Sequence, residues 1–382
     1  MRIAQVCPYD IDRPGGVQRH ILDSAAALGE LGHEVVVIAP RTHSPRRENS
    51  GIAIHRIGKA VWLGLFGTGF EISLALGRDR RALKALMRDG GFDIAHFHTP
   101  WTPFMALQAL SGFAGPAAVT FHDTPSPSLS GLLLSRLFRG LSRVLLPRFD
   151  LVLTPSDSPK AHLVPGKGQE IVIFPPCTDL RSFGAAEPQA RFRDGRINIL
   201  FLGRLEPRKG AMLALGAYHR LQGSGLKLRL ILAGAGPQEG LLRDYVRAHG
   251  MAQVEFTGAP AETASLFASA DIFCAPSPYG ESFGIVLAEA MAAGKPVVAA
   301  ANTGYRTLLT GAAADFLVPP GSVEALAAAL ETLARDESLR TRLGAWGREN
   351  ALRYDCRRLA PELVARYQDA ICRHRVRARS AI

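Results

Sequence analysis

The chain has 382 residues and a formal net charge of +11, because 45 Lys and Arg stand against 34 Asp and Glu. A hydrophobic content of 47% excludes wholesale disorder, and the length fits two domains rather than one. The basic balance favours anionic partners, which are phosphates, acidic lipid surfaces or nucleic acid, and does not choose among them.

The five cysteines are scattered, odd in number and without a C-x-x-C pair. This pattern argues against a disulfide framework and against a cysteine-based zinc site, and it favours a reduced, cytoplasmic setting. The N-terminus lacks the architecture of a signal peptide. No run reaches about 18 consecutive apolar residues, so we expect no transmembrane helix.

Short apolar runs alternate with longer amphipathic stretches along the chain. Five runs predict strands in the first half, at 2–7, 34–39, 94–97, 117–121 and 151–154, and five more follow at 197–202, 227–233, 254–257, 272–275 and 296–299. Runs rich in Leu and β-branched residues are typical of parallel strands that are buried on both faces.

We therefore predict an α/β protein with two Rossmann-like, doubly wound domains that face a cleft. The first domain spans residues 1–183 and the second spans 197–352, with a linker between them. A C-terminal helix at about 355–375 is expected to pack back on the first domain. Ligands of such sheets bind beyond the carboxyl ends of the strands.

Two segments at strand ends of the first domain carry candidate site residues. Gly15 and Gly16 follow the first strand and permit close backbone approach to a ligand at the start of a helix; a simple turn is the alternative. His122 follows a buried strand, where it can bind a sugar hydroxyl, move a proton, or serve the structure alone. His96 and His98 alternate on a strand and suggest packing or hydrogen bonding; nothing in the sequence supplies further ligands for a metal.

In the second domain, Arg204 and Lys209 lie five residues apart in a Pro-containing loop that follows a strand. Two cations converging at the carboxyl end of a strand suit a diphosphate, although a basic surface loop is the alternative.

The segment from Gly280 to Ile285 delivers Glu281 and then begins a helix. The amides of Phe283, Gly284 and Ile285 at the start of that helix would form an anion site, and Ser282 lies in the same loop. Glu289 follows on the helix. We expect Glu281 to accept hydrogen bonds from sugar hydroxyls and Glu289 from ribose hydroxyls.

In this order the motifs resemble the retaining glycosyltransferases of family 4, which have the GT-B fold. Glu281 and Glu289 match the E-x7-E motif of that family, and Arg204 and Lys209 match its donor-diphosphate contacts. Within the family, the chain is similar to the bacterial phosphatidylinositol mannosyltransferases in the segments at 7–9, 14–18, 120–122, 206–210 and 281–287.

The resemblance implies transfer of a hexosyl unit, mannose by the nearest relatives, from a GDP- or UDP-linked sugar to a lipid or glycan acceptor. It implies no cofactor and no metal. Gly16 would lie at the donor, and Tyr9 and Gln18 at the acceptor. The catalytic residues would be His122, Glu281, Arg204 and Lys209.

Two basic amphipathic stretches suggest contact with an anionic membrane, which would make the protein peripheral on the inner membrane face. The alternative is an ordinary surface helix with a stripe that faces the core. The cations are Arg78, Arg80, Arg81, Lys84 and Arg88 in the first stretch and Arg136, Arg139 and Arg143 in the second.

Two other functions share part of the pattern. A GT-B nucleotide-sugar epimerase or isomerase would have the same fold and donor site without an acceptor, and the Glu281–Glu289 spacing weighs against it. A non-catalytic polyanion-binding protein would explain the charge alone. No zinc-finger or RNA-recognition signature supports nucleic-acid binding.

Overall fold

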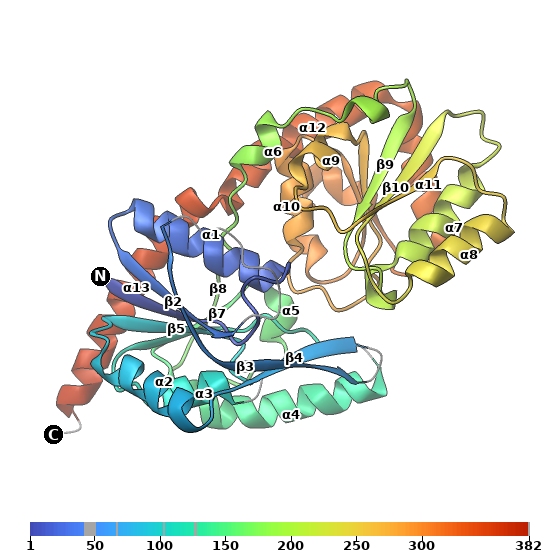
Figure 1. Ribbon diagram of the computed structural model, residues 1–382. Helices are drawn as coiled ribbons and strands as arrows, with labels where there is room; N and C mark the ends of the chain where they lie inside the picture. Colours follow the sequence, from blue (N-terminus) through green and yellow to red (C-terminus); the bar gives the residue numbers. More distant parts are fainter. Residues whose placement is uncertain (42–50, 66–67, 102–103, 126–127, 381–382) are drawn as a thin grey trace. The chain divides into compact units, whose positions relative to one another are not determined.

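The computed structural model describes residues 1–382 except 42–50, 66–67, 102–103, 126–127 and 381–382. The chain forms two compact units, shown in Figure 1. The first unit contains Met1–Asp179 and Tyr354–Ile382, and the second contains Leu180–Arg353. Part of the stretch that we expected to be a linker is structured within the second unit, because a short helix (α6, Arg181–Ala185) and a 3-10 turn (η2, Ala190–Phe192) lie there.

The first unit is built on an eight-stranded sheet of order β4-β3-β2-β1-β5-β6-β7-β8, in which β4 alone is antiparallel to its neighbour. The strands are β1 (Arg2–Val6), β2 (Glu34–Arg41), β3 (Ala53–Leu65), β4 (Thr68–Leu74), β5 (Ile94–His98), β6 (Ala117–Thr120), β7 (Leu151–Thr154) and β8 (Ile171–Ile173). Because β1 pairs with both β2 and β5, the winding reverses between β1 and β5, and ligands of doubly wound sheets bind where such a reversal opens the carboxyl edge.

Helices cover both faces of this sheet, as Figure 1 shows. They are α1 (Gly16–Glu30), α2 (Gly77–Asp89), α3 (Met105–Leu110), α4 (Leu129–Leu145), α5 (Asp157–Lys160) and α13 (Cys356–Ser380), with a 3-10 turn η1 (Leu146–Arg148) after α4. One core joins a face of the sheet to α2, α3 and α4. The other joins the opposite face to α1 and to α13, whose Tyr367 is fully buried.

The second unit has a six-stranded parallel sheet of order β11-β10-β9-β12-β13-β14. Its strands are β9 (Ile197–Leu202), β10 (Leu228–Ala233), β11 (Val254–Gly258), β12 (Ile272–Ala275), β13 (Val297–Ala300) and β14 (Leu317–Val318). Its longer helices are α7 (Ala211–Leu221), α8 (Glu239–Ala248), α9 (Ala264–Ser269), α10 (Ile285–Ala292), α11 (Val323–Arg335) and α12 (Glu337–Ala351), and short 3-10 turns η3 to η6 lie at Pro207–Lys209, Tyr305–Thr307, Gly311–Phe316 and Leu352–Tyr354. Here the winding reverses between β9 and β12.

The two parallel-sheet units confirm the predicted fold class. All ten predicted strands are present, with ends that differ by at most two residues from those expected. Strands β3, β4, β8 and β14 were not predicted. Strand β3 carries His55, Arg56 and Lys59 in place of an apolar run, and β8 and β14 have only three and two residues. Within the described part of the chain, no helix is long and apolar enough to cross a membrane.

Candidate active site

The loop after β1 is closed by its own polar groups. Gln18, in the first turn of α1, is buried and its Nε2 donates to the carbonyl of Asp10 at 3.2 Å. A Cβ on Gly15 would lie 2.3 Å from Oε1 of Gln18, so a larger residue there would displace the Gln18 side chain. Tyr9 is half-buried and packs against the core beside α1. The structure therefore brings the predicted residues Tyr9, Gly16 and Gln18 together at the carboxyl end of β1.

Buried charges support this loop from below. Asp12 pairs with Arg56 at 2.8 Å, and the carboxylate of Glu71 on β4 lies 3.3 Å from the guanidinium of Arg13. Glu71 also accepts the backbone N–H of Asp10 at 3.2 Å. Buried carboxylates held this way fix the loop conformation, and breaking one such pair is costly. The pattern of the sequence did not reveal this network, because its members come from the loop and from two strands that were not predicted.

Four histidines gather where β1, β5 and β6 end. His98 Nδ1 lies 3.1 Å from Nε2 of His122, and the two rings are stacked. His96 bonds the Tyr367 hydroxyl of α13 at 2.6 Å through Nδ1 and the Thr120 hydroxyl at 2.7 Å through Nε2. His20, on α1, has its ring centroid 5.4 Å from those of both His98 and His122. The expected hydrogen-bonding role of His96 and His98 is confirmed, and His122 joins them.

Burial keeps these imidazoles neutral. It lowers the pKa of His20 to about 4 and that of His96 to about 3, and it lowers the pKa of His98 and His122 well below the usual value. For His98 the mutual repulsion of neighbouring imidazolium charges acts in the same direction. At neutral pH each ring therefore carries one proton, and which nitrogen holds it decides which nitrogen can act as a base.

The sequence offered no further metal ligands beside His98, and here the structure corrects that expectation. One ring nitrogen each of His20, His98 and His122 lies within 4.8 Å of the others, a spacing compatible with a metal ion. Three neutral imidazoles are a ligand set that zinc accepts. In this structure, however, the facing nitrogens of His98 and His122 are at hydrogen-bond distance from each other.

In the second unit, glycines allow the loops after neighbouring strands to pack backbone against backbone. A Cβ on Gly210 would lie 2.5 Å from the carbonyl oxygen of Pro276, and one on Gly236 would lie 2.4 Å from that of Leu205. The loops that follow β9, β10 and β12 are therefore locked together at the carboxyl edge of the sheet.

A cluster of charges occupies the loops after β9 and β12. Lys209 Nζ lies 2.6 Å from Oε1 of Glu281, and both side chains are largely buried. Arg208 contacts Glu206 at 2.5 Å and donates to the carbonyl of Gly280 at 3.3 Å. Arg204 lies 3.1 Å from the same Glu206 and is half-exposed. Three cations and two carboxylates leave one net positive charge in this cluster.

Desolvation lowers the pKa of Lys209, and the neighbouring carboxylate of Glu281 opposes that shift. The pair is thus a cation held in a low-dielectric position by one anion. The two predicted cations, Lys209 and Arg204, thus lie in one charge cluster, and their contact with a diphosphate stays a prediction.

Helix α10 begins at Ile285, a short turn after Glu281. Gly284 caps it in the left-handed conformation, with φ 104°, and a Cβ there would lie 2.5 Å from the ring of Tyr305. Ser282 and Phe283 form the turn before the cap, and the Phe283 side chain is buried. Glu289 lies on the second turn of α10, 7% exposed. The helix start predicted at residues 283–285 is confirmed, and the first amides of α10 have no partner within the helix.

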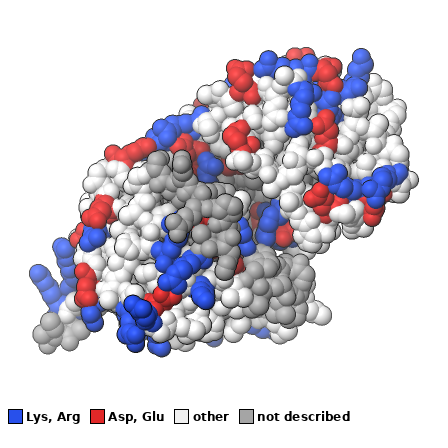
Figure 2. Space-filling view, in the orientation of Figure 1, with Lys and Arg blue, Asp and Glu red and all other residues white. Residues whose placement is uncertain are grey.

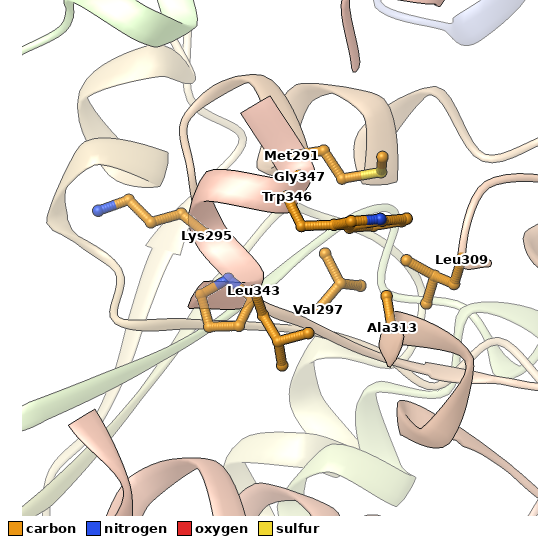
Figure 3. Close-up of a pocket in the computed structure, with 9 residues that line it drawn as sticks. Met291, Lys295, Val297, Leu309, Ala313, Leu343, Trp346 and Gly347 are labelled. Atoms are coloured by element: carbon orange, nitrogen blue, oxygen red, sulfur yellow. The ribbon is translucent and has the colours of Figure 1, made fainter. Parts of the chain in front are cut away.

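Behind α10 is a small hollow, drawn in Figure 3, between that helix and α12. Met291, Val297, Leu309 and Trp346 line it, and its volume of about 10 Å³ has room for about one water molecule. It is a packing defect of the apolar core, too small for a sugar or a nucleotide.

Comparison with known proteins shows the family. Residues 14–182 match the model described as Glycosyltransferase Family 4, and residues 184–350 match the one described as Glycosyl transferases group 1. Phosphatidyl-myo-inositol mannosyltransferase of Mycolicibacterium smegmatis is 34% identical over 96% of this chain and 94% of its own length. The chain is a family 4 glycosyltransferase. The enzyme of the same name from Mycobacterium leprae is 33% identical to this glycosyltransferase, over 96% of each chain.

Solved structures confirm the GT-B fold of this glycosyltransferase. Sucrose-phosphate synthase of Thermosynechococcus elongatus matches with a TM-score of 0.76 and 21% identity, over 97% of this chain and 99% of that one. Anabaena HepE in complex with UDP-glucose matches with a TM-score of 0.76 and 19% identity, over 96% and 98% of the two chains.

The predicted residues of this glycosyltransferase fall into one group in each unit. The group at the carboxyl edge of the first sheet consists of Tyr9, Gly16, Gln18 and His122. The group at the corresponding edge of the second sheet consists of the predicted site residues between Arg204 and Glu289. Sequence reasoning gave Arg208 no role in the site and gave His98 only packing or hydrogen bonding. Arg208 is adjacent to Lys209, and His98 shares a strand face with His96, but neither signal names the partner that the side chain contacts.

Proposed function

We propose that this glycosyltransferase is a retaining enzyme that moves a hexosyl unit, mannose in the first instance, from a nucleotide-sugar to a lipid or glycan acceptor without a metal. The observation that carries the proposal is the buried Lys209–Glu281 pair at 2.6 Å, set beside Arg204 and the start of α10. Relatives named phosphatidyl-myo-inositol mannosyltransferase support mannose and an inositol lipid. Neighbours solved with UDP or UDP-glucose keep UDP-linked donors as the second choice.

On the donor side, cationic side chains bind the diphosphate that leaves in the reaction. Lys209 and Arg204 bind the diphosphate, and the first amides of α10 add oriented dipoles. Charge that builds on the departing diphosphate in the transition state is stabilised by groups already in place. Glu281 accepts hydrogen bonds from sugar hydroxyls and Glu289 from the ribose.

These fixed cations take the place that a divalent ion fills in other nucleotide-sugar enzymes. Arg204, Arg208 and Lys209 offset the diphosphate charge, while Glu206 and Glu281 keep the empty site from accumulating like charges. Activity is therefore expected to persist in a chelator.

On the acceptor side, Tyr9 and Gln18 bind the acceptor headgroup and Gly16 lets the donor approach the backbone of α1. His122 accepts a hydrogen bond from a substrate hydroxyl. Its neutral ring suits this task, because an imidazolium would have no acceptor nitrogen.

A lipid acceptor calls for contact with a membrane, and α4 supplies the surface. Its outward face exposes large apolar side chains that no described residue covers, from Leu129 (82% exposed) through Leu133 (65%) and Leu137 (55%) to Val144 (72%), with Arg136, Arg139 and Arg143 among them. Exposed apolar patches of this kind mark interaction sites, and interleaved arginines favour an anionic lipid surface.

Helix α2 differs from α4, because its apolar residues Leu83 and Met87 are buried in the core. Its exposed face is basic, and Figure 2 shows Lys and Arg side chains gathered at the end of the first unit that carries α2 and the C-terminal half of α13. We thus assign insertion to α4 and only electrostatic attraction to α2. The enzyme would act peripherally on the inner face of the membrane.

A release assay tests the proposal. The protein is incubated in EDTA with GDP-mannose or UDP-glucose and vesicles containing phosphatidylinositol, and both the free nucleotide diphosphate and the glycosylated lipid are measured. Release that depends on the acceptor, with retained anomeric configuration in the product, is the expected result. Release of neither product with any donor would contradict the proposed reaction, and activity only after addition of Mg²⁺ would contradict its metal independence.

A further inference from the structure

The donor and the acceptor of each hydrogen bond near His122 can be assigned in turn, starting from a backbone carbonyl group, which can only accept. Ser24 Oγ lies 3.0 Å from the carbonyl oxygen of Ile21 and 3.4 Å from Oε1 of Gln5, and both of these oxygens can only accept. The hydroxyl has a single proton, and the shorter contact assigns that proton to Ile21. Ser24 then accepts from Nε2 of Gln5, at 3.1 Å. This orients the Gln5 amide with its Oε1 towards Nε2 of His98, at 3.3 Å.

The ring nitrogen that carries the proton in His98 and in His122 follows in the same way. Oε1 of Gln5 can only accept, so His98 carries its proton on Nε2 and presents a bare Nδ1. That Nδ1 lies 3.1 Å from Nε2 of His122 and must accept from it. His122 is therefore protonated on Nε2, and its Nδ1 is the unprotonated nitrogen.

We propose that the buried hydrogen-bonded series Ser24–Gln5–His98 is a positioning device that fixes the tautomer of His122, so that Nδ1 is the acceptor nitrogen of the His122 ring. The inference rests on the proposed role of His122 in glycosyl transfer. His98 does not touch substrate in this scheme: it is fully buried, whereas His122 is only partly buried. Low pKa values for both rings support the scheme, because the directional chain exists only when each ring is neutral.

His20 lies against the His98 and His122 rings but takes no part in the hydrogen-bonded series Ser24–Gln5–His98. Its Nδ1 accepts the backbone N–H of Cys177 at 2.9 Å, and its ring stands edge-on to that of His98. His98 therefore has two further rings beside it, because the ring centroid of His96 lies 4.3 Å from that of His98. A rigid aromatic enclosure of this kind limits rotation of His98 about its side-chain bonds.

The test compares two substitutions of His98. Asn places its Oδ1 near the position of the imidazole Nδ1, so His98→Asn keeps an acceptor for His122; His98→Phe keeps the ring volume and removes the acceptor. The tautomer of His122 is read from side-chain ¹⁵N NMR shifts at neutral pH, with kcat and KM measured in parallel. His122→Ala is the reference for loss of the residue itself.

We expect His122 of the wild type and of His98→Asn to be protonated on Nε2, and His98→Phe to give a mixture of tautomers. The kcat of His98→Phe should fall by about 10²-fold, within the range for loss of one acid–base group, while KM for the donor stays within twofold. His98→Asn should recover most of that loss.

Other outcomes separate the two ideas. If His122→Ala lowers kcat but His98→Phe changes neither the tautomer nor kcat, the positioning role is overturned and the proposed function stands. If His122→Ala leaves kcat unchanged, the proposed role of His122 fails, whatever tautomer the spectra show. A stoichiometric metal that co-purifies with the wild type and is absent from His98→Phe would overturn the tautomer assignment, because the facing nitrogens would then be ligands.

Discussion

Replacement of Gly304 by Ala should damage the donor site from outside it. Gly304 lies in ordinary right-handed helical backbone, with φ −67° and ψ −48°, so Ala is conformationally acceptable and would by itself stabilise the fold by about 0.4–1 kcal/mol. The added Cβ, however, would lie 2.5 Å from the carbonyl oxygen of Glu281 and 3.0 Å from the amide nitrogen of Phe283. Reaching an ordinary contact of 3.4 Å requires a shift of about 0.9 Å in that backbone.

The steric cost of the added Cβ should exceed the conformational stabilisation that Ala provides. Overpacking a tight site costs about 1–3 kcal/mol, which exceeds the conformational gain, so we expect net destabilisation of about 1–2 kcal/mol. Because the displaced backbone carries Glu281, kcat/KM should fall by about 10²-fold, the cost of a misplacement of about 1 Å.

Gly240→Ala is the matched control in the same unit. Gly240 lies near the start of α8, and an added Cβ there would meet nothing within 4 Å. We expect it to raise the free energy of unfolding by about 0.5–1 kcal/mol with kcat/KM unchanged. Urea unfolding and initial-rate kinetics measure both quantities. The reasoning is refuted if Gly304→Ala behaves like the control.

Three further outcomes are expected. Leu133→Asp combined with Leu137→Asp should lower binding to anionic vesicles by at least about tenfold, because each Leu that is buried in the membrane contributes about 1.5 kcal/mol. The Tm should stay unchanged, because both side chains are exposed in the free protein. Equal vesicle binding by the variant would contradict this expectation. The free energy of unfolding should fall from pH 7 to pH 5 by about 2 kcal/mol for each of His20 and His96. Their folded pKa values of about 4 and about 3 lie below the unfolded value, so the unfolded chain binds more protons in this range. A flat pH profile in urea unfolding would count against burial of these rings. Tyr367→Phe removes the hydroxyl that bonds His96 at 2.6 Å and should cost about 1–3 kcal/mol, seen as a lower Tm and faster proteolysis of α13, whereas wild-type behaviour would show that the bond contributes little.

Most of the fold could be predicted, because buried parallel strands leave a direct signal in the sequence. The run Leu151–Thr154 was located without error, since each of its side chains is buried. Strand β3 was missed for the opposite reason. It lies near the sheet edge, pairs with an antiparallel β4 and carries charged side chains, so it has no continuous apolar run.

The site was predictable where chemistry is local in sequence. Arg204, Lys209 and Glu281 stand in short loops after apolar runs, and strand-end position alone placed them at the carboxyl edge. The histidine cluster was not predictable in the same way. His20, His98 and His122 come from three elements, and only the strand order, which places β1 beside β5 and β5 beside β6, brings them together.

The most direct test of the account is nucleotide binding by the second-unit charge cluster. Thermal shifts are measured in EDTA with GDP, UDP, ADP and dTDP, for the wild type, for Lys209→Met and for Lys227→Met, the last an exposed lysine at the opposite, amino end of β10. We predict a rise in Tm with one nucleotide, GDP or UDP, that is kept by Lys227→Met and lost by Lys209→Met. No rise with any nucleotide, or an equal rise in both variants, would contradict a donor site built on Lys209 and Glu281.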